Sequence, residues 1–384
     1  MSVSPKLPIL LFVANHLHFL NHYYLHLIEY FKLKGYQIMV MVPLTKENDR
    51  LNNGQDFKIH VLKQYPDNNN DTLNTLKMVT EIRKGIIEMK PIAIFTFTFK
   101  ISIATAIASR NLRIPVYPTL TGLGFLFTHQ KIMALISGYF CKFIFKKCPQ
   151  IIFQNNTDYF YFLNKRWIRK ENIGLINGSG IDLKYFSPIP YPADHKIRII
   201  LYLGRMQGDK GINCLIKSLI RLKEGRIPFK CILAGPINGG HPTDIPLAKL
   251  KEWQKEGLII FIGNRLDVRP LLRQANILIQ PSKREGLSRT ILEAHACGRP
   301  VISSTAPGCG ELIREGENGW IFSTGNEKKL ALVLRKVLLL PYDILFSMSQ
   351  KTPQSISCNY ANRSVQEHYG RILNKQNSKM CEIY

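Results

Sequence analysis

The sequence predicts an α/β protein built from two doubly wound, parallel-sheet domains in tandem. Short apolar runs alternate with amphipathic stretches along the whole chain, and this alternation is typical of repeated strand–helix units. The runs fall into two series, which a proline-rich stretch without periodicity separates at residues 186–196. The length of 384 residues is also too great for one ordinary hydrophobic core.

The first series predicts the sheet of an amino-terminal, Rossmann-like domain over residues 1–185. Its apolar runs have the continuous character of strands that are buried on both faces. They are residues 8–14, 37–42, 92–97, 115–120 and 150–154. A helical pattern at residues 21–35 ends at Gly35, and glycine is the residue type that most often terminates a helix.

The second series predicts a carboxy-terminal, Rossmann-like domain over residues 197–350. Its strands are expected at residues 197–204, 229–235, 258–263, 275–282 and 299–304. Residues 186–196 are the predicted linker, and residues 351–384 are expected to form a helix that returns to the first domain, followed by a tail. Ligands of such sheets bind beyond the carboxyl ends of the strands, so we expect a site in the loops that follow them.

The charge balance indicates anionic partners. Lys and Arg number 52 against 27 Asp and Glu, which gives a formal net charge of +25. Nucleic acid, an anionic membrane face, phosphorylated substrates or a generally basic proteome all fit this excess. No recognisable nucleic-acid-binding module occurs in the sequence, so we expect no nucleic-acid partner.

One segment is a candidate for contact with a membrane. No acidic residue occurs from Met89 to Thr157, where Lys and Arg alternate with aromatic residues. This mixture suits the headgroup region of an anionic bilayer, although solvated helix faces have the same composition. Residues 131–148 are therefore either a core helix with a basic edge or a membrane-docking helix.

The cysteines and the amino terminus bear on localisation. The eight cysteines occur singly, without a CxxC pair or a zinc-ligand spacing, which indicates a reducing compartment. The apolar run after Lys6 lacks a small-residue cleavage site and is predicted to be a strand rather than a signal peptide. No run approaches the roughly 18 apolar residues of a membrane span. We expect a cytoplasmic protein, soluble or peripheral at the inner face of the cell membrane.

The loop after the strand at residues 197–204 has the character of a phosphate site. Residues 204–211, GRMQGDKG, lead into a helix that is expected to begin near Ile212. A helix N-terminus offers free backbone N–H groups and a partial positive charge. Arg205 can bind a phosphate with two hydrogen bonds, and Lys210 can neutralise it. A plain solvated turn is the alternative for this loop taken alone.

Two glutamates follow the strand at residues 275–282. The pattern predicts a helix over residues 287–296 that Gly298 caps, with Glu285 before it and Glu293 about two turns inside it. A helical rise of about 1.5 Å per residue puts their backbones about 12 Å apart, whereas the carboxyl groups of an acid–base pair lie about 5–10 Å apart. The two glutamates are better spaced to hold two hydroxyl-bearing parts of one long ligand. Two surface glutamates without a role are the alternative.

Four histidines occur near the start of the chain, at positions 16, 18, 22 and 26. His22 and His26 have the spacing of one helix face, but no acidic or Cys partner is near them in the sequence. We therefore expect no metal site there. His16 and His18 follow the first strand, where they are either surface side chains or contacts to a substrate.

Several motifs together resemble the family 4 retaining glycosyltransferases of GT-B fold. The segments that carry this resemblance are residues 177–188, 204–211, 232–236, 262–272, 285–302 and 307–322. They occur in the order and spacing of the family, and Glu285 and Glu293 match its E-x7-E motif. Residues 96–127 and 151–160 resemble a subgroup that builds bacterial surface polysaccharides such as lipopolysaccharide and O-antigen.

The resemblance implies two Rossmann-like domains that face a central cleft, with the acceptor in the first domain and a nucleotide sugar in the second. It implies that Arg205 and Lys210 bind the donor diphosphate and stabilise it as it leaves, with Glu285 at the transferred sugar. Glu293 would hold the ribose hydroxyls, and the loop of Arg265 would border the base. The implied catalytic residues are Arg205, Lys210 and Glu285. The implied donor-binding residues are Gly204, Arg205, Lys210, Gly235, Arg265, Glu285, Gly286, Leu287, Ser288 and Glu293, and the acceptor-side candidates are Asn15, His16, His18, Thr121 and Gly122.

The implied function is transfer of a hexose or N-acetylhexosamine, from a UDP-sugar, to a lipid-diphosphate-linked saccharide such as one on undecaprenyl diphosphate. The implied enzyme retains anomeric configuration and needs no metal or other cofactor, because Arg and Lys take up the charge of the leaving group. A nucleotide-sugar epimerase of the same fold, a non-catalytic nucleotide-sugar-binding protein and a nucleic-acid-binding protein are the alternatives. The sequence departs from the family at Ser288, where many members have proline, and at residues 14–24, which lack paired glycines.

Overall fold

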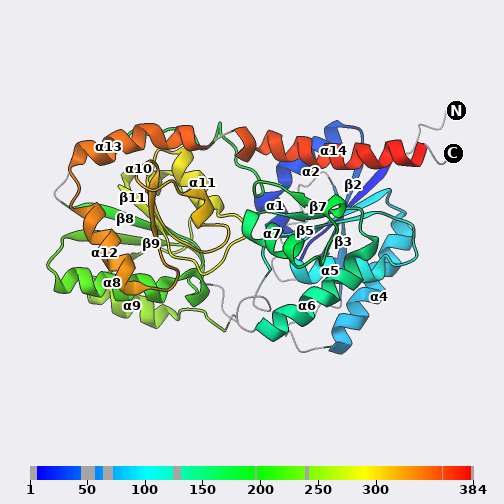
Figure 1. Ribbon diagram of the computed structural model, residues 1–384, viewed down its shortest axis with the longest axis horizontal. Coiled ribbons are helices and arrows are strands. Elements are labelled where there is room, and N and C mark those ends of the chain that lie inside the picture. Colours follow the sequence, from blue (N-terminus) through cyan, green and yellow to red (C-terminus); the bar gives the residue numbers. More distant parts are fainter. Residues whose placement is uncertain are drawn as a thin grey trace. The chain divides into compact units, whose positions relative to one another are not determined.

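The computed structural model describes residues 7–44, 57–63, 72–123, 131–194, 197–237, 242–356 and 358–381. The chain divides into two compact units (Figure 1). Unit 1 comprises Met1–Gly180 and Asn362–Tyr384, and unit 2 comprises Ile181–Ala361. Each unit is a parallel-sheet α/β domain, so the predicted fold class of two Rossmann-like domains is confirmed.

Unit 1 contains a seven-stranded parallel sheet in the order β3-β2-β1-β4-β5-β6-β7. Its strands are β1 Ile9–Val13, β2 Gln37–Pro43, β3 Lys58–Leu62, β4 Ala93–Phe97, β5 Val116–Leu120, β6 Ile151–Phe153 and β7 Ile173–Leu175. All five strands expected here are present. The sequence pattern missed β3, where only the last residue is buried, and β7, which has three residues, because neither forms a long apolar run.

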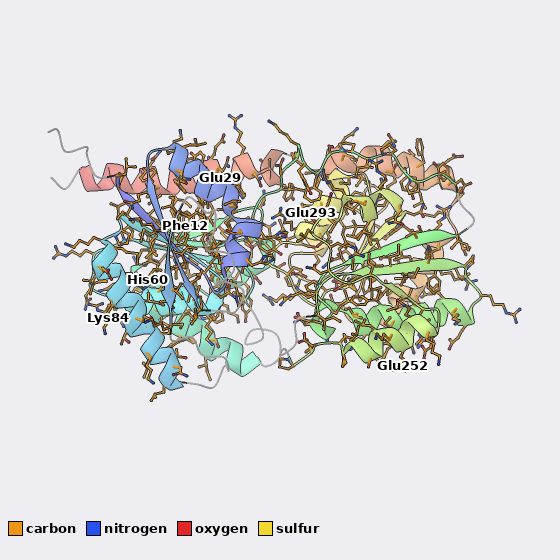
Figure 2. The ribbon with its side chains drawn as sticks, turned by 180° about the vertical axis from the view of Figure 1, so that it is seen from behind. Phe12, Glu29, His60, Lys84, Glu252 and Glu293 are labelled. Atoms are coloured by element: carbon orange, nitrogen blue, oxygen red, sulfur yellow. The ribbon has the colours of Figure 1, made fainter. Side chains whose placement is uncertain are left out.

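Helices cover both faces of this sheet, as expected for a doubly wound domain. Side chains of α1, α2 and α14 pack in one core cluster, and those of α4, α5 and α6 pack in another. The helices are α1 Leu17–Tyr23, α2 Leu25–Leu33, α4 Thr72–Met89, α5 Phe99–Ala108, α6 Lys131–Ile144, α7 Asn156–Asn164 and α14 Asn362–Cys381. Figure 2 shows Phe12 within the first cluster, where its ring centroid lies 5.5 Å from that of Phe95.

The single helix predicted at residues 21–35 was wrong, because the chain breaks at Tyr24. Tyr24 has a φ of −133° and a ψ of 9° between α1 and α2, and its side chain is fully buried. Its hydroxyl accepts a hydrogen bond of 2.8 Å from Gln154 Nε2. A buried side chain therefore sets the backbone here, against the helical period. His22 and His26 consequently belong to different helices.

The carboxy-terminal helix α14 packs on unit 1. The hydroxyl groups of Tyr369 and Thr119 on β5 form a hydrogen bond of 2.6 Å, and Gln366 Nε2 donates to the carbonyl oxygen of His26. The sequence placed the start of the returning segment at residue 351, and the structure places it at Asn362. Residues 382–384 of the expected tail lie outside the described residues.

Unit 2 contains a six-stranded parallel sheet in the order β10-β9-β8-β11-β12-β13. Its strands are β8 Arg198–Leu203, β9 Phe229–Ala234, β10 Ile260–Phe261, β11 Ile277–Gln280, β12 Val301–Ser304 and β13 Gly319–Phe322. Its helices are α8 Ile212–Glu224, α9 Leu247–Lys255, α10 Arg269–Gln274, α11 Arg289–Ala296, α12 Glu327–Leu338 and α13 Tyr342–Lys351. The five expected strands are confirmed, and β13 is an addition at the edge.

The stretch predicted to be a linker packs on unit 2 as far as it is described. Phe186 and Tyr191 are buried in its core clusters. The carbonyl oxygens of Ile189 and Pro190 accept hydrogen bonds from Arg299. Proline removes backbone donors but keeps carbonyl acceptors, so a proline-rich stretch can still be fixed by a buried cation. Residues 195–196 lie outside the described part.

Of the helices in the described residues, none has the length together with the apolar character that crossing a bilayer requires.

Candidate functional site

The candidate site lies at the switch point of the unit 2 sheet. β8 and β11 are neighbours in that sheet, although two strands intervene between them in the sequence. From β8 the chain moves toward β9 and β10, and from β11 it moves the other way, toward β12 and β13. Loops at the carboxyl ends of two such strands diverge and leave a crevice for ligands. The predicted residues Arg205, Lys210 and Glu285 lie in the two loops that follow these strands.

The loop after β8 is held in one conformation by the segment at residues 243–245. Gly208 N donates to the carbonyl oxygen of Thr243 over 2.7 Å, and Ile245 N donates to that of Met206 over 2.8 Å. Gln207 Nε2 adds a hydrogen bond of 2.9 Å to Asp244 Oδ1. A functional loop held in this way keeps its side chains in place before any ligand arrives.

A glycine at the end of this loop lets it approach the loop after β11. Gly211 has a φ of +81°, and a Cβ atom there would lie 2.0 Å from the carbonyl oxygen of Pro281. No other residue type fits this position, because it needs both the left-handed backbone and the missing side chain. Gly211 therefore fixes the two loops side by side at the start of α8.

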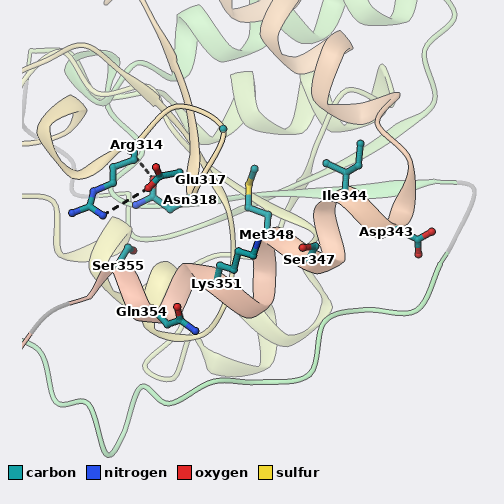
Figure 3. A pocket seen from close by; sticks show the side chains of 11 residues that line it. Arg314, Glu317, Asn318, Asp343, Ile344, Ser347, Met348, Lys351, Gln354 and Ser355 are labelled. Carbon is teal, nitrogen blue, oxygen red and sulfur yellow. Dashed lines mark hydrogen bonds and ion pairs between the residues drawn. The ribbon is translucent and has the colours of Figure 1, made fainter.

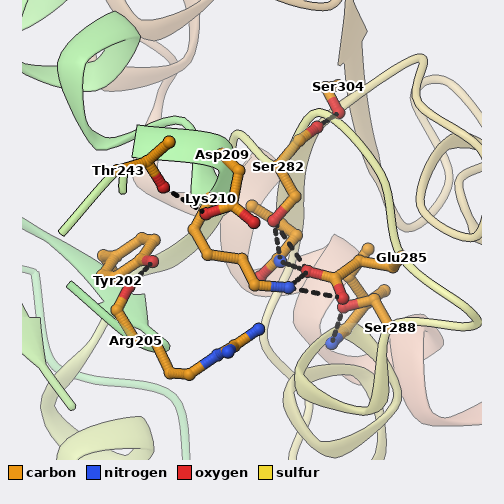
Figure 4. Close-up of polar contacts among 11 residues, drawn as sticks. Tyr202, Arg205, Asp209, Lys210, Thr243, Ser282, Glu285, Ser288 and Ser304 are labelled. Carbon is orange, nitrogen blue, oxygen red and sulfur yellow. Dashed lines mark hydrogen bonds and ion pairs between the residues drawn. The ribbon is translucent and has the colours of Figure 1, made fainter. Parts of the chain in front are cut away.

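Lys210 and Glu285 form the centre of the site (Figure 4). Lys210 Nζ lies 2.8 Å from Glu285 Oε1 and 2.9 Å from Oε2. Ser282 Oγ donates to Glu285 Oε1 over 2.8 Å, and Gln280 Nε2 donates to the same oxygen over 3.3 Å. Three donors thus fix the carboxylate, and the salt bridge is only partly exposed, at 14% for Lys210 and 20% for Glu285.

Arg205 contributes a second positive charge beside this pair. Its backbone carbonyl accepts a hydrogen bond of 2.8 Å from the hydroxyl of buried Tyr202. Its side chain is exposed and reaches toward Lys210 in Figure 4. Within the described ranges, its guanidinium has no hydrogen-bond partner. Arg205 is therefore available for an anion, whereas Lys210 is already shared with Glu285.

The helix that carries the second glutamate begins later than predicted. α11 starts at Arg289, and Ser288 is its N-cap, with its Oγ accepting from Ile291 N. Glu293 therefore lies only a little more than one turn inside the helix, not two. Ser288, which stands where many members of the resembled family have proline, supplies a side chain that caps a helix well. Its own backbone N–H donates to the carbonyl oxygen of Gly308 over 2.7 Å, so that donor is already used within the protein.

Glu293 is a buried carboxylate with a cationic partner. Its side chain is 10% exposed, and its Oε1 lies 2.9 Å from Arg289 Nε. Burial raises the pKa of Glu293, and the charge and hydrogen bond of Arg289 lower it, with burial the larger influence. The two glutamates thus have separate partners, Lys210 for Glu285 and Arg289 for Glu293. Their roles as two separate ligand contacts stay a prediction.

Replacing Glu293 by glutamine is expected to stabilise the ligand-free protein near pH 7 and to weaken nucleotide binding. A carboxyl whose pKa is raised on folding binds its proton more tightly in the folded state, so its charged form costs stability above that pKa. The gain should disappear well below the ordinary pKa of 4.5, where both states are protonated. The Kd for UDP should rise about tenfold or more if Glu293 accepts ribose hydroxyl groups. Urea unfolding at several pH values and calorimetric titration with UDP measure the two effects.

The matched control for this variant is Glu256→Gln, because Glu256 is exposed at the end of α9. This control should change neither the free energy of unfolding nor the Kd for UDP appreciably. Destabilisation of the Glu293→Gln variant at pH 7 would mean that the ion pair with Arg289 outweighs the cost of burial.

Among the other predicted donor residues, the glycines have a clear packing role. A Cβ atom on Gly235, which has a φ of +150°, would lie 1.9 Å from the carbonyl oxygen of Gly204. These two glycines bring the carboxyl ends of β8 and β9 together. Arg265 is exposed and donates to the carbonyl oxygen of Asn264 over 3.3 Å. Gly286 and Leu287 lie between Glu285 and the N-cap of α11.

The predicted acceptor-side residues are all in unit 1. Asn15, His16 and His18 follow β1, and Thr121 and Gly122 follow β5. The strand β4 lies between β1 and β5, so these residues share the carboxyl edge of one parallel sheet. His18 stacks on His22, with ring centroids 5.9 Å apart. Across the described residues, no three His, Cys, Asp or Glu side chains are grouped to hold a metal.

Gln280, Ser282 and Arg289 also contribute to the site, although they are not among the residues predicted from the sequence. Gln280 and Ser282 are buried at 4% and 0% exposure, and both orient Glu285. The sequence does contain a signal for Gln280 and Ser282. Two polar residues at the end of an otherwise apolar buried strand need hydrogen-bond partners, which indicates a polar site there. Arg289 had a signal too, since it stands four residues before Glu293 on the same helix face.

A separate hollow of unit 2 contains none of the predicted residues. This pocket of about 780 Å³ is lined by Arg314, Gly316, Glu317, Asn318, Asp343, Ile344, Ser347, Met348, Lys351, Gln354 and Ser355. Figure 3 shows these side chains around it, with Arg314 and Glu317 in an ion pair of 3.7 Å. Charges of both signs line the pocket, so its composition favours no particular ligand.

Solved structures similar to this chain span nearly all of it. Alr3699/HepE from Anabaena, solved in complex with UDP and glucose, has a TM-score of 0.75 at 19% identity, over 95% of this chain and 99% of that one. Sucrose-phosphate synthase from Thermosynechococcus elongatus has a TM-score of 0.76 at 19% identity, over 97% and 100%. The chain has the GT-B fold.

Two family models match the GT-B chain, one in each unit. Residues 197–339 match glycosyl transferases group 1, and residues 9–155 match glycosyl transferase 4-like proteins. Together the matches support a GT-B glycosyltransferase, which is the coarser part of the predicted function.

Curated relatives of the GT-B chain are bacterial glycosyltransferases. The N,N'-diacetylbacillosaminyl-diphospho-undecaprenol alpha-1,3-N-acetylgalactosaminyltransferase of Campylobacter jejuni is 28% identical over 253 residues, which is 62% of this chain and 64% of the relative. The lipopolysaccharide core biosynthesis mannosyltransferase LpcC of Rhizobium leguminosarum is 23% identical over 51% of this chain and 58% of its own length. The chain thus spans less than two thirds of each of these relatives.

Proposed function

We propose that the protein is a retaining, metal-independent family 4 hexosyltransferase of cell-surface glycan biosynthesis. It moves a hexose or N-acetylhexosamine from a UDP-sugar to a lipid-diphosphate-linked saccharide, and it works at the inner face of the cell membrane. The observation that carries the proposal is the grouping of Arg205, Lys210 and Glu285 at the switch point of unit 2. The relative from Campylobacter jejuni, named for a diphospho-undecaprenol acceptor, supports the choice of acceptor.

The proposed chemistry needs charge stabilisation more than proton transfer by a side chain. The bond between the anomeric carbon and the diphosphate oxygen breaks, and negative charge develops on the leaving diphosphate. Arg205 and Lys210 take up this charge as fixed cations, which is the most effective form of transition-state stabilisation. The acceptor hydroxyl attacks the anomeric carbon from the same face, and its proton passes to the departing phosphate oxygen.

Glu285 has a different part in this proposal. Its carboxylate is held by Lys210, Ser282 and Gln280, so it remains an oriented acceptor for hydroxyl groups of the transferred sugar. Glu293 lies farther along α11 and accepts from the ribose. The nucleotide and the sugar are thus held at two ends, with the diphosphate between them near the N-terminus of α11.

The experiment that tests the proposal uses purified protein, a panel of labelled UDP-sugars and a membrane lipid extract. The expected result is loss of label from one donor and its appearance in the lipid fraction, with or without added chelator. If no donor is consumed, and UDP binding survives the loss of both Arg205 and Lys210, the assignment fails. Conversion of the donor to an epimer without transfer would instead identify an epimerase.

A further inference from the structure

Helix α6 in unit 1 has two apolar faces, and one of them is packed against the domain. Gly138 and Cys141 are buried, as is Phe145 just past the helix. A Cβ atom on Gly138 would lie 2.1 Å from the ring of Trp167, so helix and ring are in direct contact there. A surface helix needs only one such apolar face to hold its place.

The second apolar face of α6 points to solvent. Ile136, Tyr139, Phe140 and Phe143 are 58%, 59%, 53% and 58% exposed. Their spacing puts them in one stripe of the helix, and we call these four residues the α6 stripe. Single exposed apolar side chains are ordinary, but contiguous large ones mark a surface that another body covers. In Figure 1, α6 lies at the margin of unit 1, outside α5.

Positive charge surrounds the α6 stripe. Lys142 is exposed on α6, and Lys146 and Lys147 are exposed in the 3-10 turn that follows it. The guanidinium of Arg110 lies 4.5 Å from the ring centroid of Phe143. Because Trp167 touches Gly138, the basic segment at residues 165–170 adjoins the helix as well. No Asp or Glu occurs from Met89 to Thr157, so nothing acidic in this part of the sequence offsets these charges.

We propose that the α6 stripe inserts into the headgroup region of an anionic lipid bilayer, with the surrounding Lys and Arg on the lipid phosphates. Interleaved aromatic and basic residues on one helix face suit this environment. A protein partner is less well matched, because lysine is depleted at the centres of protein interfaces. A stable dimer also buries about 800 Å² on each partner, more than four half-exposed side chains provide.

This inference deepens the proposed function and rests on it for the identity of the acceptor, since a lipid-linked saccharide is presented at such a surface. The surface itself consists of the α6 stripe and the basic residues beside it, and it does not depend on the donor site. Membrane binding and donor consumption are separate measurements, so either can fail without the other.

Flotation of the full-length protein with vesicles tests the proposal. Vesicles of phosphatidylcholine with phosphatidylglycerol are expected to carry the protein at low salt, and vesicles of phosphatidylcholine alone are not. The variant with Ile136→Ser, Phe140→Ser and Phe143→Ser should lose at least about tenfold in partition, since it removes most of the insertable apolar area. The matched control, Leu332→Ser with Leu339→Ser, removes residues of 60% and 58% exposure in unit 2 and should change nothing.

The charge component is tested in the same assay. Lys142→Gln with Lys146→Gln should weaken binding to the anionic vesicles by about fivefold for each charge removed. The control is Lys251→Gln with Lys255→Gln on α9, where both lysines are exposed. All variants should keep the circular dichroism spectrum and the thermal unfolding midpoint of the unaltered protein, which shows that both units remain folded.

Three outcomes would overturn the inference. Equal flotation of the serine variant and its control would show that the α6 stripe is not the contact. Equal flotation with neutral and with anionic vesicles would show that the Lys and Arg side chains do not contribute to binding. A dimer in sedimentation that the serine substitutions dissociate, without any vesicle binding, would assign the surface to a second copy of the chain.

Discussion

Replacing Lys210 by methionine is expected to lower the rate of donor turnover by about 10²–10³-fold. Lys210 is held 2.8 Å from Glu285 in a partly buried pair, so in the proposed reaction its charge is in place before a diphosphate begins to leave. A positive charge that needs no rearrangement stabilises the transition state more than a mobile one. Steady-state turnover of the UDP-sugar identified by the donor panel measures the effect.

A comparison with Glu285→Gln separates the charge of Lys210 from its contact with Glu285. UDP lacks the sugar that Glu285 is proposed to hold, so only Lys210→Met should raise the Kd for UDP. If Lys210 acts only by positioning Glu285, the two variants will bind UDP equally well. The control is Lys217→Met on α8, which removes an exposed lysine and should leave turnover unchanged. Turnover of Lys210→Met within about threefold of the unaltered protein would contradict the proposed role.

The sequence was sufficient to predict the central strands of both sheets. These strands are apolar throughout, because helices cover both of their faces. Edge strands β3 and β7 escaped prediction because a partly exposed or very short strand lacks that signal. The break at Tyr24 also escaped, since a distant hydrogen bond from Gln154 competes there with local helical preference.

The candidate site, like the fold, could be predicted from the sequence only in part. The loops with Arg205, Lys210 and Glu285 could be predicted because each follows a recognisable strand. Their meeting depends on the strand order, which brings β8 beside β11, and strand order is not written in any single segment. The hydrogen bonds of Ser282 and Gln280 to Glu285 depend on side-chain directions at a strand end, so sequence reasoning left them out.

Replacing Arg299 by methionine is expected to destabilise unit 2 by about 3–5 kcal/mol. The side chain is fully buried, and its guanidinium donates to backbone carbonyl oxygens of three segments. The acceptors are Leu272, Arg273, Cys297, Gly298, Ile189 and Pro190. Burial lowers the pKa of Arg299 to about 10, so it remains charged at neutral pH and no carbonyl loses its donor.

The size of this effect follows from where the acceptors lie. Leu272 and Cys297 stand at the ends of α10 and α11, where the last carbonyl groups of a helix lack regular partners within it and use other donors. Ile189 and Pro190 belong to the proline-rich stretch, whose prolines have no N–H group to donate. Methionine would fill the space but donate nothing, so the oxygens of Ile189 and Pro190 would lose the Arg299 donor at a substantial desolvation cost. Leu272 and Cys297 would keep only the longer bonds from Ala275 N, at 3.3 Å, and Ile189 N, at 3.4 Å. The Arg299→Lys variant should recover only part of the lost stability, because an ammonium group cannot reproduce the planar, forked donors of a guanidinium group.

Hydrogen exchange measured by mass spectrometry can show which unit loses stability in the Arg299→Met variant. Exchange in Arg299→Met should speed up in peptides of unit 2 and stay unchanged in the sheet of unit 1. Arg273→Met is the control, since it removes an exposed side chain and keeps the backbone carbonyl that Arg299 uses. Uniform exchange in both units would contradict a local role for Arg299.

The same variant tests how far the site depends on this buried cation. α11 carries Glu293, and Arg299 holds the end of that helix through the carbonyl groups of Cys297 and Gly298. If nucleotide binds the folded unit only, UDP at about 100 times its Kd should restore about 2.7 kcal/mol of stability. Recovery of slow exchange in α11 peptides at that concentration would show that Arg299 supports the site through folding. Failure of UDP to slow the exchange would instead mean that the substitution distorts α11 within a folded unit.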